Sequence, residues 1–267
     1  MQRTTRIKLT YTEDVDLAVE RFSDHEDMSE ARMLRWLEQF PDADLPLVMR
    51  VMASVRYYNR LNLRTMTRQL FTIASEMMRE RGYQRVVFVA VGDAGSGSSF
   101  VARMLRELIR GTPHRLMSML DLSRAEPGSI DAVVFVDDFS GTGQTLEMWW
   151  ENVEALVRPT GAAIFVGLLV LNERARQRVE QLGHVLAVEE LDDTQNIFRP
   201  ENQAFSDPEK ARIEEHCRST GCGAKYERGF GSCGLLLAFR HGCPNNSLPV
   251  LWYSGNRWRP LFNRRAV

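Results

Sequence analysis

The residues whose types and spacing are best suited to chemistry lie between Val133 and Thr145. Four apolar residues, β-branched or aromatic, are followed by the adjacent acids Asp137 and Asp138 and, after Phe139, by Ser-Gly-Thr-Gly-Gln-Thr. The apolar run is typical of a buried strand, and the residues after Thr145 have the pattern of a helix. Glycines let backbone N–H groups approach an anion, and the first helical turn adds free N–H groups and the positive end of the helix dipole. The stretch therefore predicts a phosphate-binding turn beside two carboxylates.

A second glycine-rich loop has the same setting between a strand and a helix. The apolar run at 85–91 leads into Gly-Asp-Ala-Gly-Ser-Gly-Ser-Ser, and an amphipathic helical pattern follows from Phe100. In open α/β sheets, ligands bind beyond the carboxyl ends of the strands. We therefore expect the two loops to flank the acid pair and to hold a ligand that carries phosphate groups at both ends.

The elements that must position these loops follow the order of an α/β protein. Further apolar strands are expected at 162–171 and 184–190, with a helix between them at about 172–181. Strands that are apolar throughout are typical of a parallel sheet with helices on both faces. This is the predicted fold class.

The segments on either side of this core have different patterns. We expect a three-part chain, with an N-terminal helical extension at 1–82, the α/β core at 83–200 and a C-terminal α+β hood at 201–267. In the extension, residues 1–12 read as an extended arm, and helices are expected at 29–40, 46–58 and 63–81. In the hood, a helix is expected at 207–217, and strands at 235–239 and 250–253.

Composition excludes several classes of protein. The chain has 267 residues, with 44% hydrophobic and 26% charged residues, as in ordinary globular proteins. A net charge of −1 provides no overall attraction to nucleic acid. No apolar stretch has the length of a membrane span, and the basic N-terminus is not followed by the apolar run of a secretory signal. We therefore expect a cytoplasmic protein with reduced cysteines.

A P-loop NTPase is the main alternative among enzymes. Gly92 and Gly97 have the Gly-x4-Gly spacing of that loop, but Ser98 stands where the loop needs its lysine. The chain has only three lysines, Lys8, Lys210 and Lys225. A dinucleotide-binding motif is disfavoured because Phe100 stands where its third glycine is required.

Two polar groups near the C-terminus leave alternatives open. Cys217, Cys222, Cys233 and Cys243, with His216 and His241 nearby, could supply four zinc ligands, but no pair has the usual Cys-x2-Cys spacing. Buried thiols are the favoured interpretation. The loop from His241 to Pro249 is either a second site or a structural turn in which asparagines form bends.

The stretch at 133–145 resembles the phosphoribosyl-pyrophosphate (PRPP) signature of type I phosphoribosyltransferases. The resemblance implies that Asp137 and Asp138 act on the ribose hydroxyls and support Mg²⁺. It implies that the 5′-phosphate is bound by the turn formed by Ser140, Gly141, Thr142, Gly143, Gln144 and Thr145. It assigns the pyrophosphate to the earlier loop, at Gly92, Asp93, Ala94 and Gly95. In purine-type members an acid stands at the position of Gly141, and orotate-type members use lysines that this core lacks, so the ligand is better supported than the reaction.

A narrower resemblance lies near the C-terminus. The stretch Leu-Leu-Ala-Phe-Arg-His-Gly-Cys-Pro-Asn-Asn-Ser-Leu-Pro-Val-Leu-Trp and the later Trp-Arg-Pro-Leu-Phe-Asn-Arg are similar to bacterial phosphoribosyltransferase-like proteins of conflict systems. The resemblance implies a Mg²⁺-dependent effector in anti-phage defence, with winged-helix or reverse-transcriptase and non-coding RNA partners of a retron operon. The alternative is a non-catalytic subunit that senses PRPP or a nucleotide.

Overall fold

The chain forms two compact units. The computed structural model describes residues 3–92 and 96–264. The sheet unit comprises residues 61–192, and the terminal unit comprises the described residues on either side of it, 3–60 and 193–264. This arrangement differs from the expected division at residues 82 and 200, because the first and last segments of the chain share one hydrophobic core.

A five-stranded sheet organises the sheet unit. Its strand order is β3-β2-β4-β5-β6, and every neighbouring pair is parallel. The strands are β2 (Val86–Ala90), β3 (Arg115–Met117), β4 (Ala132–Ser140), β5 (Ala163–Asn172) and β6 (His184–Leu191). The chain places β3 on one side of β2 and β4 on the other. The strand order therefore reverses between β2 and β4, and such a switch point is where ligands bind in open α/β sheets.

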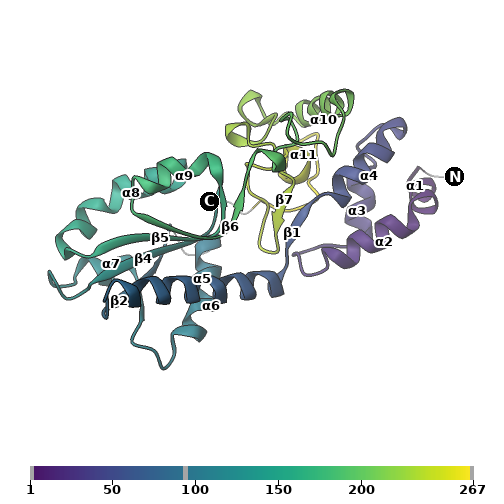
Figure 1. Ribbon diagram of the computed structural model, residues 1–267. Coiled ribbons are helices and arrows are strands. Elements are labelled where there is room, and N and C mark those ends of the chain that lie inside the picture. The colour runs from purple at the N-terminus through teal and green to yellow at the C-terminus, as the bar shows by residue number, and fades with distance from the viewer. Residues whose placement is uncertain (1–2, 93–95, 265–267) are drawn as a thin grey trace. The chain divides into compact units, whose positions relative to one another are not determined.

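Helices cover both faces of this sheet (Figure 1). One face carries α8 (Gln144–Val157) and α9 (Glu173–Glu180), and the other carries α5 (Arg60–Glu80) and α6 (Gly97–Ile109). The short α7 (Met119–Ser123) joins the α8 side through Leu122. Because both faces are covered, β2 and β5 are apolar at almost every position. The predicted fold class, a parallel sheet with helices on both faces, is confirmed.

The side chains of β4 illustrate this double burial. Val133 and Phe135 pack in one cluster with Leu146 and Trp150 of α8. On the other face, a Cβ on Gly167 of β5 would lie 3.3 Å from the methyl groups of Leu70 of α5, which shows how closely α5 lies over the strands. The sheet is thus a rigid support for the loops at its carboxyl edge.

The terminal unit is built mainly of helices from both ends of the chain. Its helices are α1 (Arg3–Thr10), α2 (Thr12–Arg21), α3 (Glu30–Leu37), α4 (Leu45–Ala53), α10 (Asp207–Ser219) and α11 (Pro249–Trp252). Strands β1 (Arg56–Tyr58) and β7 (Leu237–Phe239) pair in parallel. The Trp36 indole of α3 donates a hydrogen bond to the Val250 carbonyl oxygen at 2.8 Å. These contacts join segments separated by about 200 residues into one core.

Most expected elements are present with small shifts at their ends, and three expectations are wrong. Residues 3–10 form a helix rather than an extended arm, and Ile7 on that helix is buried. Residues 249–252 form a helical turn rather than a strand, because Pro249 begins it and cannot donate to a strand ladder. The helix expected at 46–58 ends at Ala53, and Arg56–Tyr58 is a strand that pairs with β7. No described helix is both long and apolar enough to cross a membrane.

Candidate phosphate and ribose site

The acid pair lies inside the carboxyl-terminal part of β4. Pairing with β5 continues through Asp137↔Leu168, Phe139↔Val170 and Ser140↔Leu171. The expected strand end at Val136 was therefore too early, because the longer β5 carries the ladder four residues further. Pairing of β4 on both sides holds the two acids on a rigid backbone near the carboxyl end of the strand.

Asp137 is the more perturbed of the two acids. Burial raises its pKa well above the usual carboxyl range, and the negative charge of Asp138 raises it further. The Asp138 backbone N–H donates a 2.9 Å hydrogen bond to Asp137 Oδ1, which partly offsets these effects. Two adjacent carboxyls that resist double ionisation favour one shared proton, or a cation or hydroxyl ligand between them.

The Asp138 carboxylate lies against the first residue of α6. A Cβ built on Gly97 would lie 2.2 Å from Cγ, Oδ1 and Oδ2 of Asp138. No side chain fits at that distance, so only glycine allows this approach. The N-terminus of a helix attracts negative charge, and no side-chain hydrogen bond from the N-cap residue Ser96 occupies it. The Asp138 carboxylate thus lies at the N-terminus of α6, which was expected to face an anionic ligand.

The turn after β4 has the features of an anion-binding loop. Gly143 is the N-cap of α8 and has a left-handed φ of 76°, which favours glycine. Glycine has no side chain to cap the first turn of α8, so the N–H groups of that turn are available to an anion. Ser140 is buried at the strand end, and Gln144 and Thr145 are exposed in the first helical turn.

Arg178 of α9 supports this turn and was not singled out in the sequence. Its Nη1 donates a 2.6 Å hydrogen bond to the Thr142 carbonyl oxygen, and its Nε lies 3.0 Å from Glu147 Oε2 of α8. Its side chain also contacts the position that a Cβ on Gly143 would occupy, at 3.1 Å. Nothing in local periodicity identifies Arg178, because its role depends on α8 and α9 lying side by side.

The second loop is described only at its ends. Gly92 has a left-handed φ of 75°, and Asp93, Ala94 and Gly95 lie outside the described residues. Ser98 is buried, and its hydroxyl donates to the Val91 carbonyl oxygen. The residue at the position of the P-loop lysine is therefore part of the strand-to-helix junction, which argues further against an NTPase.

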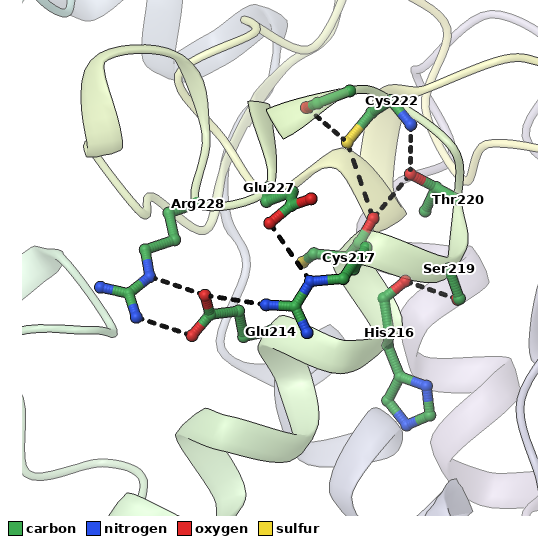
Figure 2. A network of polar contacts seen from close by, with 10 residues as sticks. Glu214, His216, Cys217, Ser219, Thr220, Cys222, Glu227 and Arg228 are labelled. Carbon is green, nitrogen blue, oxygen red and sulfur yellow. Dashed lines mark hydrogen bonds and ion pairs between the residues drawn. The ribbon is translucent and has the colours of Figure 1, made fainter. Parts of the chain in front are cut away.

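The cysteines near the C-terminus are core thiols. All four are buried, and burial raises the pKa of Cys217 and Cys243 far above the ordinary thiol value. Such buried thiols stay protonated and unreactive at neutral pH. Figure 2 shows that Cys222 directs its Sγ toward the Cys217 carbonyl oxygen, at 3.6 Å, while Glu214 pairs with Arg228 nearby. Among residues 3–92 and 96–264, no three His, Cys, Asp or Glu side chains are grouped to hold a metal.

The loop that begins at His241 is structural. The His241 ring stacks on Phe239 of β7, with ring centroids 5.3 Å apart. Asn246 Nδ2 donates to the Phe230 carbonyl oxygen at 3.0 Å, and Ser247 Oγ donates to the Leu237 carbonyl oxygen at 2.7 Å. These polar groups hold the core of the terminal unit together, as the structural interpretation of the loop requires.

Comparisons with known proteins identify a family for this chain. The model of the PRTase-CE family matches residues 33–264 of the chain. No curated protein matches it. Among solved structures, the chain resembles hypoxanthine-guanine phosphoribosyltransferase from Schistosoma mansoni in complex with IMP, with 13% identity and a TM-score of 0.35. The match covers 49% of this chain and 66% of that chain, which is just under two thirds of its length. A hypoxanthine-guanine-xanthine phosphoribosyltransferase has 14% identity, a TM-score of 0.34, and coverage of 56% and 87%. Orotate phosphoribosyltransferase from Aeropyrum pernix has 16% identity, a TM-score of 0.30, and coverage of 47% and 69%.

Proposed function

Because this chain belongs to the PRTase-CE family of phosphoribosyltransferase-like proteins, we propose that it binds PRPP or a related phosphoribosyl nucleotide together with Mg²⁺ and acts on it as an enzyme. One arrangement carries the proposal. An acid pair at the end of β4 is followed directly by a glycine turn and an uncapped helix N-terminus. These features lie at the switch point of the parallel sheet.

Each part of the ligand has a matching group. The 5′-phosphate binds the N–H groups at the start of α8, with hydroxyls of Ser140, Thr142 and Thr145 as further donors. The ribose hydroxyls bind Asp137 and Asp138, since carboxylates are strong acceptors for vicinal hydroxyls. The raised pKa of Asp137 favours a ligand that donates hydrogen bonds to the pair or brings positive charge to it.

The donor set fits Mg²⁺ as a cofactor shared with the ligand. Mg²⁺ is bound in proteins through one or two carboxylates together with substrate phosphates and water. Two adjacent carboxyls are present, and the described chain groups no third acid with them, so phosphates would supply the remaining oxygens. When bound, the ion would neutralise pyrophosphate charge and relieve the repulsion between Asp137 and Asp138.

The chemistry requires little from side chains beyond position and charge. In transfer from PRPP, the bond between ribose C1 and the pyrophosphate oxygen breaks, and pyrophosphate leaves with the electron pair. An acceptor nitrogen or a water oxygen forms the new bond at C1 and releases its proton to pyrophosphate or solvent. The electron-poor ribose of this step is stabilised by nearby carboxylates and by fixed geometry. A turn held by Arg178 and a strand paired on both sides provide that geometry.

A second candidate is a non-catalytic sensor of PRPP or a nucleotide. Gly141, which is buried, stands where purine-type transferases carry an acid for the base, and the sheet unit contains no lysine. These two features favour binding without transfer to a purine.

The experiment that tests the proposal combines binding with turnover. PRPP is titrated into the protein with Mg²⁺ by calorimetry, and released pyrophosphate and ribose 5-phosphate are quantified. We expect saturable binding that is abolished by Asp137→Asn with Asp138→Asn and retained by the control pair Glu126→Gln with Glu151→Gln, which are exposed acids of the same unit. Binding that survives the acid-pair change would refute the site, and tight binding without any product would favour the sensor.

The biological setting follows from the resemblance of the C-terminal segments. We propose that the protein acts as an effector in bacterial anti-phage defence, with partners encoded in the same operon. Phages should plate less efficiently on cells that carry the whole operon than on cells with an empty vector. An operon that encodes the Asp137→Asn, Asp138→Asn variant should restore efficient plating. Equal plating with the wild-type operon and with an empty vector, across a panel of phages, would contradict this role.

A further inference from the structure

The terminal unit contains a basic pocket that the proposed function does not use. Its volume is about 570 Å³, within the range of small-molecule sites. The pocket lies between α3 and the segment that follows α11. The side chains that carry the argument are four arginines and two aromatic residues: Arg32, Arg35, Arg259, Arg264, Trp252 and Tyr253.

The charge of this pocket is only partly compensated. Among the described residues, no carboxylate lines it. Within the described part of the chain, no ion pair engages Arg35 or Arg259, although both side chains are exposed. Burial has the largest effect on the pKa of Arg32 and lowers it. The charge of Asp27 raises this pKa, and the neighbouring Arg35, the smallest of the three effects, lowers it. Cations held together with few acids nearby repel one another, and a bound anion reduces that cost.

The Arg32 side chain is held in the fold by hydrogen bonds. Its Nε donates to the Leu261 carbonyl oxygen at 2.8 Å, and its Nη2 donates to Asn263 Oδ1 at 2.6 Å. The Gln39 side chain exchanges hydrogen bonds with the backbone of Arg259, at 2.7 and 2.8 Å. The Arg32 side chain and the backbone at Arg259 are therefore fixed before any ligand arrives, which lowers part of the entropic cost of binding.

One side of the pocket offers a planar surface, formed by the exposed Arg264 guanidinium over the buried Trp252 ring. The Arg264 guanidinium lies over the Trp252 ring, 5.0 Å from its centroid. Tyr253 is half-buried and lies edge-on to Trp252, with ring centroids 5.9 Å apart. Nucleobases stack on aromatic rings and on guanidinium planes, and arginine forks bind phosphate through two parallel hydrogen bonds. An acidic peptide would use the charges but not the stacking surface.

We propose that this pocket is a second ligand site that binds a nucleotide, with its phosphates on Arg35 and Arg259 and its base against the Arg264 guanidinium and Tyr253. Free nucleoside phosphates and a nucleotide within a single strand share this chemistry. The site is made only of residues of the terminal unit. It does not depend on PRPP binding in the sheet unit.

The test uses the full chain and two probes, ATP and a short single-stranded oligoribonucleotide. Calorimetry should detect binding of at least one probe, and Arg35→Glu and Arg259→Glu should each weaken it about tenfold or more, the effect of losing a charged hydrogen bond. Arg257→Glu is the matched control, because this exposed arginine lies on the same segment but does not line the pocket. The probe that binds more tightly identifies the source of the nucleotide.

Two outcomes would overturn the proposal. The first is no binding of either probe by the wild-type protein, and the second is binding that the Arg35 and Arg259 variants leave unchanged. PRPP titrations separate this site from the other one. Arg35→Glu should leave PRPP binding intact, and Asp137→Asn with Asp138→Asn should leave ATP or oligonucleotide binding intact.

Discussion

Gly97→Ala tests the contact on which the candidate site depends. A Cβ at this position would lie 2.2 Å from three atoms of the Asp138 carboxylate. Carbon atoms pack at about 3.5–4.0 Å, so the carboxylate must move by more than about 1 Å. Asp138 has a short side chain on a paired strand, and it can move only by leaving its rotamer and the α6 terminus.

The size of the effect follows from these two losses. An off-rotamer side chain costs about 0.5–1.5 kcal/mol, and leaving a helix N-terminus costs about 0.3–1 kcal/mol or somewhat more when partly buried. Alanine in place of glycine contributes up to about 1 kcal/mol of helix propensity in the opposite direction. In an Asp138→Ala background the clash is absent, so Gly97→Ala should stabilise the protein there. The two changes should therefore be coupled by about 1–3 kcal/mol.

The assay is a double-mutant cycle in which the free energy of unfolding of each variant is measured with urea, on the unfolding transition that Asp138→Ala shifts. PRPP is also titrated into each variant. We expect Gly97→Ala to weaken PRPP binding by about tenfold or more, because it displaces the Asp138 carboxylate, which is proposed to bind the ribose hydroxyls. Arg106→Ala, on an exposed position of the same helix, should show additivity with Asp138→Ala within about 0.5 kcal/mol. A coupling below that value for Gly97, or normal PRPP binding by Gly97→Ala, would refute the reasoning.

Three further predictions concern the same site. A raised pKa means that the folded protein binds a proton that the unfolded chain releases, so the contribution of Asp137 to stability is complete below about pH 3.9 and is lost as the pH rises through the raised pKa. Asp137→Asn should consequently raise the melting temperature at pH 7 without Mg²⁺ and lose this advantage near pH 3.5, and an equal advantage at both pH values would contradict the assignment. Arg178→Ala removes the hydrogen bond to the Thr142 carbonyl and should weaken PRPP binding roughly 3- to 10-fold by calorimetry; Arg176→Ala, on the same helix but paired with other acids, is its control and should bind normally. Removal of Mg²⁺ with EDTA should weaken PRPP binding at least about tenfold by the same method, and unchanged affinity would exclude a shared ion.

Sequence patterns alone predicted the architecture of the sheet unit. Long apolar runs separated by helical patterns indicated a parallel sheet, and the structure has that sheet with β2 and β4 as neighbours. The predicted turn after β4 is also present, with Gly143 in the left-handed conformation that only a small residue adopts easily. Such features are predictable because they depend on residues within a few positions of one another.

The remaining features depend on contacts between distant segments. The sequence does not show that α1 is a helix in the terminal unit, since Ile7 is stabilised by a core that forms only when both ends of the chain meet. It does not show that β1 pairs with β7, because three-residue strands have no clear periodicity. The pocket of four arginines likewise requires α3 and the C-terminal segment to lie together.

At the candidate site, the sequence by itself determined which groups are present: two adjacent acids, a glycine turn and the start of a helix. Tertiary structure decided how they act on one another. Parallel pairing of β2 with β4 brings Gly97 against Asp138, and the packing of α9 beside α8 brings Arg178 to the Thr142 carbonyl. Burial beside a second carboxylate then raises the pKa of Asp137. Local spacing selects residue types, whereas charge, burial and approach distance arise only when separate strands and helices share one sheet.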